Sequence, residues 1–206
     1  MKLKEAKWRL DEIEGFSHPK IKYEQYMTPS ELACAVVYVM AVENDDVQQK
    51  TVLDLGCGTG MLSAAVLLYG AASVTGLDVD ASLESLYENN LQKVSEGQHR
   101  FICADVQDAQ FNELPQFDTA IINPPFGTKN NSGIDVTFLE KALEKASVVY
   151  SMHKTSTREY FKTKYSGRIR ILSEMQFELK KTYKFQKKES VHVKVDLIRV
   201  TKEQEK

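Results

Sequence analysis

The chain has 206 residues, of which 42% are hydrophobic and 27% charged, and its net charge is −2 at pH 7. These ordinary values allow one domain with a sizeable core and exclude a collagen-like, mucin-like or wholly disordered chain. The charge is unevenly distributed: residues 1–150 carry 12 Lys and Arg against 22 Asp and Glu, and residues 151–206 carry 15 against 7. A basic C-terminal part can bind an anion with one face, although a solvated surface is the simpler interpretation.

The cysteines argue against both a disulfide framework and a metal site. Cys34, Cys57 and Cys103 have no paired spacing, and the four histidines lie far from them and from one another. We therefore expect no metal and a reducing compartment. The charged N-terminus does not resemble a signal peptide, and the longest apolar stretch, residues 64–72, is too short to span a bilayer. The sequence predicts a soluble intracellular protein with no membrane partner.

Strand-like and helix-like patterns alternate from residue 30 onward, after a short amphipathic helix predicted within the first sixteen residues. Ser156 and Glu159 form a capping-box pattern that predicts one more helix. The alternation predicts an α/β fold with a parallel sheet covered on both faces, and the last two strands predict an antiparallel edge hairpin. We predict strands over residues 51–55, 73–77, 100–103, 117–122, 168–177 and 191–200, and helices over residues 31–42, 61–69, 83–94 and 136–149, the last passing into a strand near residues 148–152.

A glycine-rich turn, DLGCGTG at residues 54–60, follows the first predicted strand and precedes a helix. Glycine lets the backbone turn tightly and approach a ligand closely. The N-terminus of the following helix offers unpaired N–H donors. This pattern favours a nucleotide-like ligand, with an ordinary strand–helix turn as the alternative.

A carboxylate ends each of the next two predicted strands. Asp78 comes 22 residues after Gly56, where a carboxylate can accept hydrogen bonds from both hydroxyls of a ribose. A helix cap is the alternative role, but Asp80 is better placed for capping. Asp105 ends the third strand and is placed to accept from an adenine amino group, with Val106 shaping a slot for the ring. These features fit a dinucleotide and S-adenosylmethionine equally well.

The motif that separates these two ligands is Asn123-Pro124-Pro125-Phe126, at the end of the fourth predicted strand. Each proline stiffens the turn and removes a backbone donor while keeping its carbonyl. The Asn123 side-chain oxygen and the Pro124 carbonyl are therefore acceptors, and the Phe126 ring offers a stacking face. Acceptors beside a stacking plane suit a planar substrate that carries an NH₂ group, whereas hydride transfer needs neither.

DLGCGTG, GLDVD at residues 76–80, CADV at residues 103–106 and NPPF together resemble the Rossmann-like class I S-adenosylmethionine-dependent methyltransferases that modify amino groups. The flanking motifs narrow the resemblance. EQY and TP at residues 24–26 and 28–29, NPPFGTKNN at 123–131, SMHKTSTRE at 151–159 and YKFQKKESV at 183–191 look like the methyltransferase-like protein 5 family. Met27 departs from the pattern, since a proline is expected before Thr28.

This resemblance implies a Rossmann-like seven-stranded, mostly parallel sheet in a single domain over residues 1–206. It implies a helical and lid extension over residues 1–45, a cofactor-binding core over 50–150 and a basic part over 151–206. It also implies N6-methylation of one adenosine in small-subunit ribosomal RNA and a heterodimer with a small zinc-binding activator. We expect the protein in the nucleus and the cytoplasm.

The residue chemistry and the resemblance together give the predicted site. The catalytic residues are Asn123, Pro124, Pro125 and Phe126. The residues predicted to bind the cofactor S-adenosyl-L-methionine are Gln25, Tyr26, Thr28, Asp54, Gly56, Gly58, Thr59, Met61, Asp78, Asp105, Val106 and Asn123. The residues predicted to contact RNA are Lys129, Asn130, Lys154, Lys184, Lys187 and Lys188, because lysines interleaved with aromatic residues suit phosphate contact and stacking. A solvated hairpin loop is the alternative for the last three.

In the expected mechanism the target adenosine is flipped out and stacks on Phe126, and alignment supplies most of the rate. No catalytic His or Cys is predicted, and His153 is expected to be structural or to contact RNA. Two alternatives stay open: methylation of another amino group, such as a glutamine amide of a translation factor or guanine N2, and a scaffold that binds cofactor or RNA without catalysis.

Overall fold

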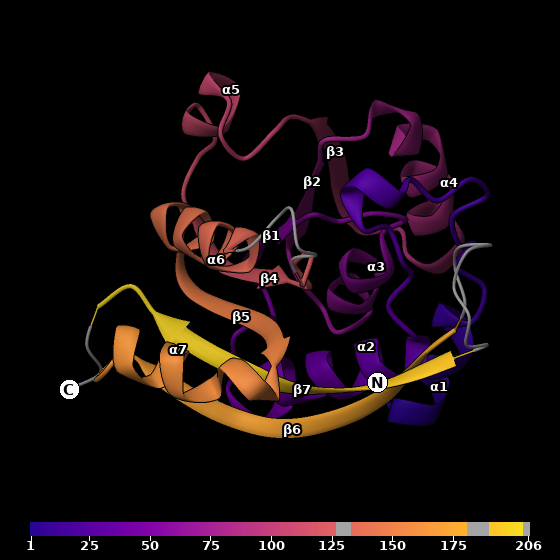
Figure 1. Cartoon of the computed structure of the whole chain (residues 1–206). Coiled ribbons are helices and arrows are strands. Elements are labelled where there is room, and N and C mark those ends of the chain that lie inside the picture. Colours follow the sequence, from indigo (N-terminus) through magenta and orange to yellow (C-terminus); the bar gives the residue numbers. More distant parts are fainter. Residues whose placement is uncertain (127–132, 181–189, 204–206) are drawn as a thin grey trace.

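A seven-stranded sheet in the order β3-β2-β1-β4-β5-β7-β6 forms the centre of the computed structural model, which describes residues 1–126, 133–180 and 190–203 (Figure 1). The pairs within β3-β2-β1-β4-β5 are parallel, and β7 runs antiparallel to both β5 and β6. The predicted fold class is therefore confirmed. The strands are β1 Thr51–Leu55, β2 Ser73–Asp78, β3 Gln98–Cys103, β4 Phe117–Ile122, β5 Ala146–Lys154, β6 Ile169–Lys180 and β7 Ser190–Thr201.

Helices cover both faces of this sheet, as the alternation predicted. The α-helices are α1 Leu3–Leu10, α2 Ser30–Tyr38, α3 Met61–Leu68, α4 Glu84–Val94, α5 Ala109–Asn112, α6 Ile134–Lys145 and α7 Arg158–Lys164. Three short 3₁₀ turns, η1 Ile21–Tyr23, η3 Ala81–Leu83 and η4 Thr155–Thr157, and a π-helical turn, η2 Val39–Glu43, complete the described helical structure. None of the described helices is long and apolar enough to cross a membrane.

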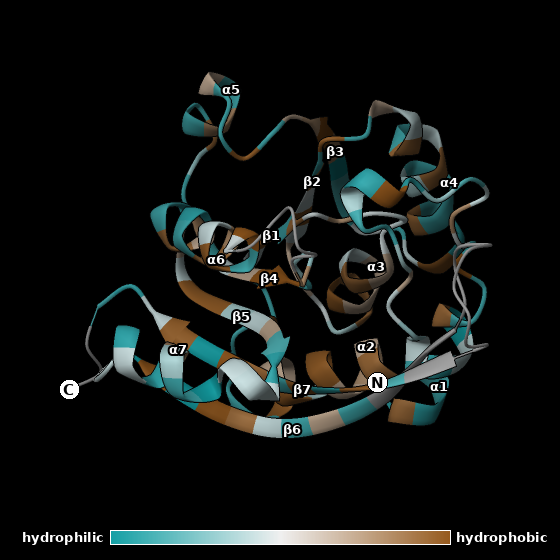
Figure 2. Cartoon of the chain, in the orientation of Figure 1, coloured by the Kyte–Doolittle hydropathy of each residue, from teal (hydrophilic) through white to brown (hydrophobic). Residues whose placement is uncertain are grey.

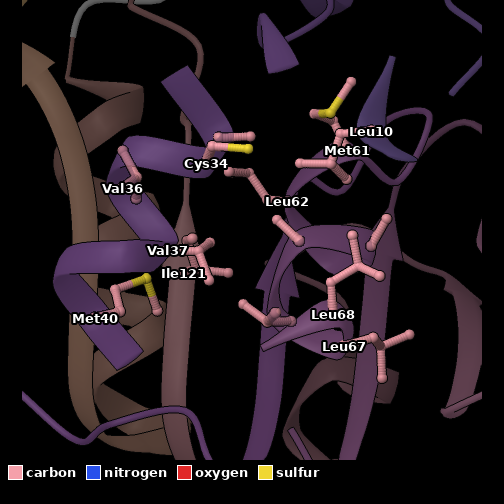
Figure 3. Close-up of a cluster of buried hydrophobic side chains, with 14 of the residues drawn as sticks. Leu10, Cys34, Val36, Val37, Met40, Met61, Leu62, Leu67, Leu68 and Ile121 are labelled. Carbon is pink, nitrogen blue, oxygen red and sulfur yellow. The ribbon is translucent and has the colours of Figure 1, made fainter. Parts of the chain in front are cut away.

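Two hydrophobic clusters form the core, one on each face of the sheet. The first lies among α1–α4, where every residue of α3 is buried because this helix has neighbours on all sides (Figures 2 and 3). The second lies among α5, α6 and α7. Successive strand residues point to opposite faces, so Val52 belongs to the first cluster and Leu53 to the second.

Two sequence predictions were wrong in detail. The helix expected over residues 136–149 ends at Lys145, and Ala146 is already extended and pairs with Phe117 of β4. Ala146 and Val149 continue the helical spacing of the apolar residues before them, but they belong to a strand that pairs with β4. The capping box is also not formed. Ser156 lies in η4, and the Thr157 hydroxyl donates to the Lys154 carbonyl at 2.7 Å instead of capping α7.

The three cysteines are free thiols, and Cys34 and Cys57 are buried. Among the residues that the structure describes, no group of three or more His, Cys, Asp or Glu side chains is arranged to hold a metal ion.

Close packing against Gly76 of β2 gives a stability prediction. A Cβ atom at this position would lie 2.6 Å from the Tyr87 ring and hydroxyl, and Tyr87 is fully buried, with its hydroxyl donating to Ser63. Such overpacking costs about 1–3 kcal/mol. We expect Gly76→Ala to lower the free energy of unfolding by that amount in urea titrations, and Ser73→Ala on the same strand to change it by less than ~0.5 kcal/mol. Equal stability of the two variants would contradict this packing.

Candidate active site

A cavity opens where β1, β2, β3 and β4 end, because the carboxyl ends of parallel strands meet at one edge of the sheet. The N-terminal segment around η1 supplies its remaining wall. All twelve residues predicted to bind the cofactor lie on this wall: Gln25, Tyr26, Thr28, Asp54, Gly56, Gly58, Thr59, Met61, Asp78, Asp105, Val106 and Asn123. Of the predicted catalytic residues, Asn123 and Pro125 also line the cavity.

Asp54, on β1, is a buried carboxyl at the floor of the cavity. It accepts a hydrogen bond of 2.6 Å from the Ser63 hydroxyl, which in turn accepts one from the Tyr87 hydroxyl at 3.0 Å. Burial raises the pKa of Asp54 to about 7 despite the hydrogen bond from Ser63. The floor thus holds a carboxyl that ionises more readily when a cation lies beside it.

The glycine-rich turn brings its backbone close to two aromatic rings. Gly56 and Gly58 have φ values of +79° and +54°, which side-chain-bearing residues rarely adopt. A Cβ at Gly56 would lie 3.1 Å from Phe138 of α6, and one at Gly58 would lie 3.0 Å from Phe16. Both rings line the cavity. The two glycines are therefore required by conformation and by space.

Asp78 lies at the end of β2, opposite this turn. One carboxylate oxygen accepts from the Gly58 N–H at 2.9 Å, and the other accepts from the Asp80 N–H at 3.0 Å. Burial raises the pKa of Asp78 even though both hydrogen bonds oppose that shift. Each carboxylate oxygen can accept more than one hydrogen bond, so the group is fixed in place and still able to bind a pair of hydroxyls.

Asp80 caps η3 as predicted, since its side chain accepts from the Ser82 N–H. The same carboxylate binds the N-terminal segment: Lys20 Nζ lies 2.5 Å from Oδ1, and Gln25 Nε2 donates to Oδ2 at 2.8 Å. Although burial opposes the shift, the hydrogen bonds from Lys20, Ser82 and Gln25 lower the pKa of Asp80. The side chain of Gln25 therefore fastens the cavity wall to the loop after β2.

Asp105 and Val106 form the wall beyond β3. Val106 is buried, and Asp105 is half-buried with one carboxylate oxygen accepting from the Gln107 N–H at 2.9 Å. The Asp105 N–H donates to Asp108, which fixes the turn. A carboxylate beside an apolar slot is the arrangement that the sequence suggested at this strand end.

Asn123 follows β4 and is held by two side chains of the N-terminal segment. Its Oδ1 accepts from the Tyr26 hydroxyl at 3.0 Å, and its Nδ2 donates to Thr28 Oγ1 at 3.0 Å. These two hydrogen bonds hold the amide in place between two hydroxyl groups, with Oδ1 facing Tyr26. Burial raises the pKa of Tyr26 even though the hydrogen bond to Asn123 opposes that shift, so the phenol stays neutral.

Phe126 is the last residue of the turn over residues 123–126, called the acceptor turn below. Its ring lies beside the Tyr26 ring and the Lys154 ammonium. Its ring stacks with the Tyr26 ring at a centroid distance of 6.0 Å and an interplanar angle of 19°. The Lys154 ammonium lies 5.7 Å from the ring centroid and 3.5 Å from the Phe126 carbonyl oxygen. Lys154, predicted to contact RNA, thus lies against the acceptor turn. The other predicted RNA contacts, Lys129, Asn130, Lys184, Lys187 and Lys188, lie outside the described residues.

Sequence reasoning missed several residues that line the cavity. Phe16 and Tyr23 come from the N-terminal segment, and Ile134 and Phe138 come from α6. The spacing of Ile134 and Phe138, four residues apart on the helix after the NPPF motif, was a usable signal. No local pattern places Phe16 over Gly58, since the two are distant in sequence.

Comparison with known proteins agrees with this geometry. The family model for the methyltransferase small domain matches residues 34–149, which include all four strands that end at the cavity. By fold and by sequence, the chain is a methyltransferase of this class.

Relatives that match nearly the whole chain show which family of methyltransferases it belongs to. The rRNA N6-adenosine methyltransferase METTL5 of Danio rerio is 40% identical, with 98% of this chain and 99% of that protein covered. The corresponding metl-5 of Caenorhabditis elegans is 41% identical, with 97% of each chain covered. The crystal structure of PH1948 from Pyrococcus horikoshii superposes with a TM-score of 0.83 at 30% identity, covering 98% of this chain and 96% of that one. The chain belongs to the METTL5 family.

The position of Asp78 gives a binding prediction. If its carboxylate accepts from two ribose hydroxyls, Asp78→Ala removes two charge-assisted hydrogen bonds and should weaken S-adenosylmethionine binding at least about tenfold by calorimetry. Glu113→Ala, which removes an exposed carboxylate outside the cavity wall, serves as the matched control. Unchanged affinity in Asp78→Ala would remove the ribose assignment.

The raised pKa of Asp54, about 7, predicts how the stability of the ligand-free protein depends on pH. The ordinary value in an unfolded chain is about 3.9, so between about pH 4 and pH 7 the folded state binds more protons than the unfolded state. The contribution of Asp54 to stability is therefore lost as the pH rises through this window. Compared with Asp54→Asn, the wild type should lose stability from pH 4 to pH 8 in urea unfolding, and parallel curves would contradict the raised pKa.

Proposed function

We propose that the chain transfers the methyl group of S-adenosylmethionine to N6 of an adenosine in small-subunit ribosomal RNA, as the catalytic subunit of a heterodimer. Membership of the METTL5 family supports the reaction class, since the full-length relatives are named rRNA N6-adenosine methyltransferases. The single observation that carries the proposal is the Asn123 amide, which two hydrogen bonds hold at the wall of the cavity.

The charge of the cavity supports this cofactor over a dinucleotide. The charged side chains on its wall are Glu24, Asp54, Asp78 and Asp105 against Lys22. A dinucleotide would bring two negative phosphates into this acidic surrounding, whereas S-adenosylmethionine brings a sulfonium and an ammonium against one carboxylate, which leaves it with a net positive charge. Opposite charges at short range stabilise each other in a partly buried site. The residues present therefore fit S-adenosylmethionine.

In the proposed complex each part of the cofactor meets a group suited to it. Asp78 accepts from the ribose hydroxyls, and Asp105 with Val106 binds the adenine. The glycine-rich turn allows close approach of the backbone, and Asp54 lies below it as a carboxyl that a nearby cation would ionise. The cofactor supplies an electrophilic methyl group on sulfur.

The protein's part in methyl transfer is alignment. Asn123 Oδ1 and the Pro124 carbonyl accept from the N–H groups of the target base, which directs the nitrogen lone pair toward the methyl group. The nitrogen–carbon bond forms as the carbon–sulfur bond breaks, and the sulfur keeps the electron pair. The extra proton on nitrogen then passes to water, so no side-chain base is required. Holding two reactants in line supplies a large share of such a rate enhancement.

Two alternatives share the same acceptor turn. A glutamine side-chain amide or guanine N2 also presents an NH₂ group to Asn123, and a scaffold would bind the cofactor without reaction. The fixed Asn123 amide disfavours the scaffold, because orienting an acceptor has no use without a substrate amino group. The full-length relatives favour adenosine over the other amino groups.

Resemblance to the family also supports the partner and the location. We propose a small zinc-binding activator as the second subunit, with the lone chain poorly soluble because an apolar surface is exposed without it. A stable and fully active monomer would contradict this. The expectation that the protein works in the nucleus and the cytoplasm stays a prediction.

The test is a labelling experiment. The full chain, alone and with the activator, is incubated with methyl-labelled S-adenosylmethionine and with RNA and protein fractions from cells that lack the gene. We expect label in small-subunit RNA that yields N6-methyladenosine on digestion. Label in a translation factor or in guanine would favour the alternatives, and bound cofactor without any transfer would favour the scaffold.

Asn123→Ala separates catalysis from cofactor binding in the same assay. Loss of the amide removes the oriented acceptor, so methyl transfer should fall at least about a hundredfold. Cofactor affinity measured by calorimetry should stay within a few-fold of the wild-type value. A large loss of affinity would instead place the main role of Asn123 in cofactor binding.

A further inference from the structure

Two consecutive residues at the end of β5 contact both ends of the connection between β4 and α6. Lys154 reaches the acceptor turn, where its ammonium lies 3.5 Å from the Phe126 carbonyl oxygen. His153 reaches the first turn of α6, where its Nδ1 lies 3.2 Å from Asp135 Oδ2. β5 pairs directly with β4, with Ser151 opposite Ile122. The end of β5 is thus the neighbouring support for Asn123.

The hydrogen bonds of His153 determine its tautomer. The Asp135 carboxylate can only accept, so Nδ1 carries a proton and donates to it. In the neutral ring Nε2 is then an acceptor, and it receives the Ser151 hydroxyl at 2.7 Å. Burial lowers the pKa of His153 although Asp135 and Asp196 raise it, so the neutral ring is the stable form. Every polar atom of the ring is satisfied in this arrangement.

Ser151, His153 and Asp135 have the order of a hydrolase triad, but burial excludes that role. Ser151 is 0% and His153 1% exposed, and neither lines the cavity. The His153 ring packs against Phe161 of α7 at a centroid distance of 3.9 Å. No substrate can reach the hydroxyl, so the network acts on the position of its neighbours.

We propose that His153 and Lys154 are positioning residues for methyl transfer: from β5 they hold the acceptor turn and the N-terminus of α6 in the arrangement that the reaction needs. The kinetic test of this inference rests on the proposed function, because it measures methyl transfer to RNA. Two elements of the cavity wall depend on this support. Lys154 holds the turn that begins with Asn123, and Asp135 holds the end of α6 that carries Ile134 and Phe138 to the cavity.

In this proposal the charge on Lys154 stabilises the acceptor turn, independently of the RNA contact predicted from the sequence. Its ammonium donates to a carbonyl and lies 5.7 Å from the Phe126 ring centroid, a distance at which a cation and an aromatic face attract. A lysine that only contacts phosphate would change RNA affinity and its salt dependence. A lysine that positions the turn changes the turnover number.

The experiment compares variants of the full chain with labelled S-adenosylmethionine and a small-subunit rRNA fragment. His153→Phe keeps a ring against Phe161 and removes both nitrogens, whereas His153→Asn keeps a donor toward Asp135. Lys154→Met keeps the side-chain length without the charge. Tyr150→Phe is the matched control, because it removes the partly buried hydrogen bond to Asp46, 2.6 Å long, from the same strand but touches neither end of the connection.

We expect kcat to fall at least tenfold in His153→Phe and Lys154→Met, with the KM for RNA and the Kd for cofactor within threefold of wild type. His153→Asn should recover part of kcat, and Tyr150→Phe should keep it within twofold. Asp135→Asn combined with His153→Phe should lose no more than the worse single variant, since both remove one link. Wild-type kcat in folded His153→Phe, or a change in KM alone in Lys154→Met, would overturn the proposal.

Hydrogen–deuterium exchange tests the same inference without a substrate. Amides of peptides that contain residues 123–126 and 134–138 should exchange at least threefold faster in His153→Phe and Lys154→Met than in the wild type and in Tyr150→Phe. Equal exchange in all four proteins would overturn the positioning role. This measurement needs no methyl transfer. It can therefore test the positioning role even if RNA proves not to be the substrate, and the two failures can be told apart.

Discussion

The position of every functional side chain depends on how β1 pairs with its two neighbours. Leu55 lies opposite Leu77 of β2, and Asp54 lies opposite Ile121 of β4. This register places Asp78 at the end of β2 and Asn123 just beyond the end of β4, on either side of the glycine-rich turn. A shift of one residue would turn each strand's side chains to the opposite face, so the packing of both hydrophobic clusters also fixes the site.

The N-terminal segment connects the two halves of this site. Lys20 and Gln25 bind Asp80, near Asp78, the carboxylate proposed to bind ribose, while Tyr26 and Thr28 bind Asn123. One stretch of nine residues thus contacts both the cofactor side and the substrate side. Resemblance suggested a cofactor lid for these residues, and the geometry adds that two of them, Tyr26 and Thr28, hold the Asn123 amide in place.

The sequence was a good guide wherever a local pattern carried the information. Strands β1 and β4 have the predicted bounds, and Asp80 caps η3 as its spacing suggested. Contacts between distant segments left no such pattern: Tyr26 and Asn123 are 97 residues apart. The change from α6 to β5 was blurred because Ala146 and Val149 continue the helical spacing, and only pairing with β4 shows that they are extended. The four-residue helix α5 is too short for periodicity to show.

In the proposed function, the position of Tyr26 in the N-terminal segment decides whether a base can stack on Phe126. Its ring and that of Phe126 are 6.0 Å apart, whereas a flat base between two stacking faces needs about 3.5 Å on each side. A base that stacks on this face of Phe126 therefore requires Tyr26 to move away by about 1 Å or more. That movement strains the hydrogen bond from Tyr26 to Asn123 Oδ1, the atom that accepts from the base in the proposed function. In the proposed function, substrate binding and the release of the acceptor oxygen are then one event.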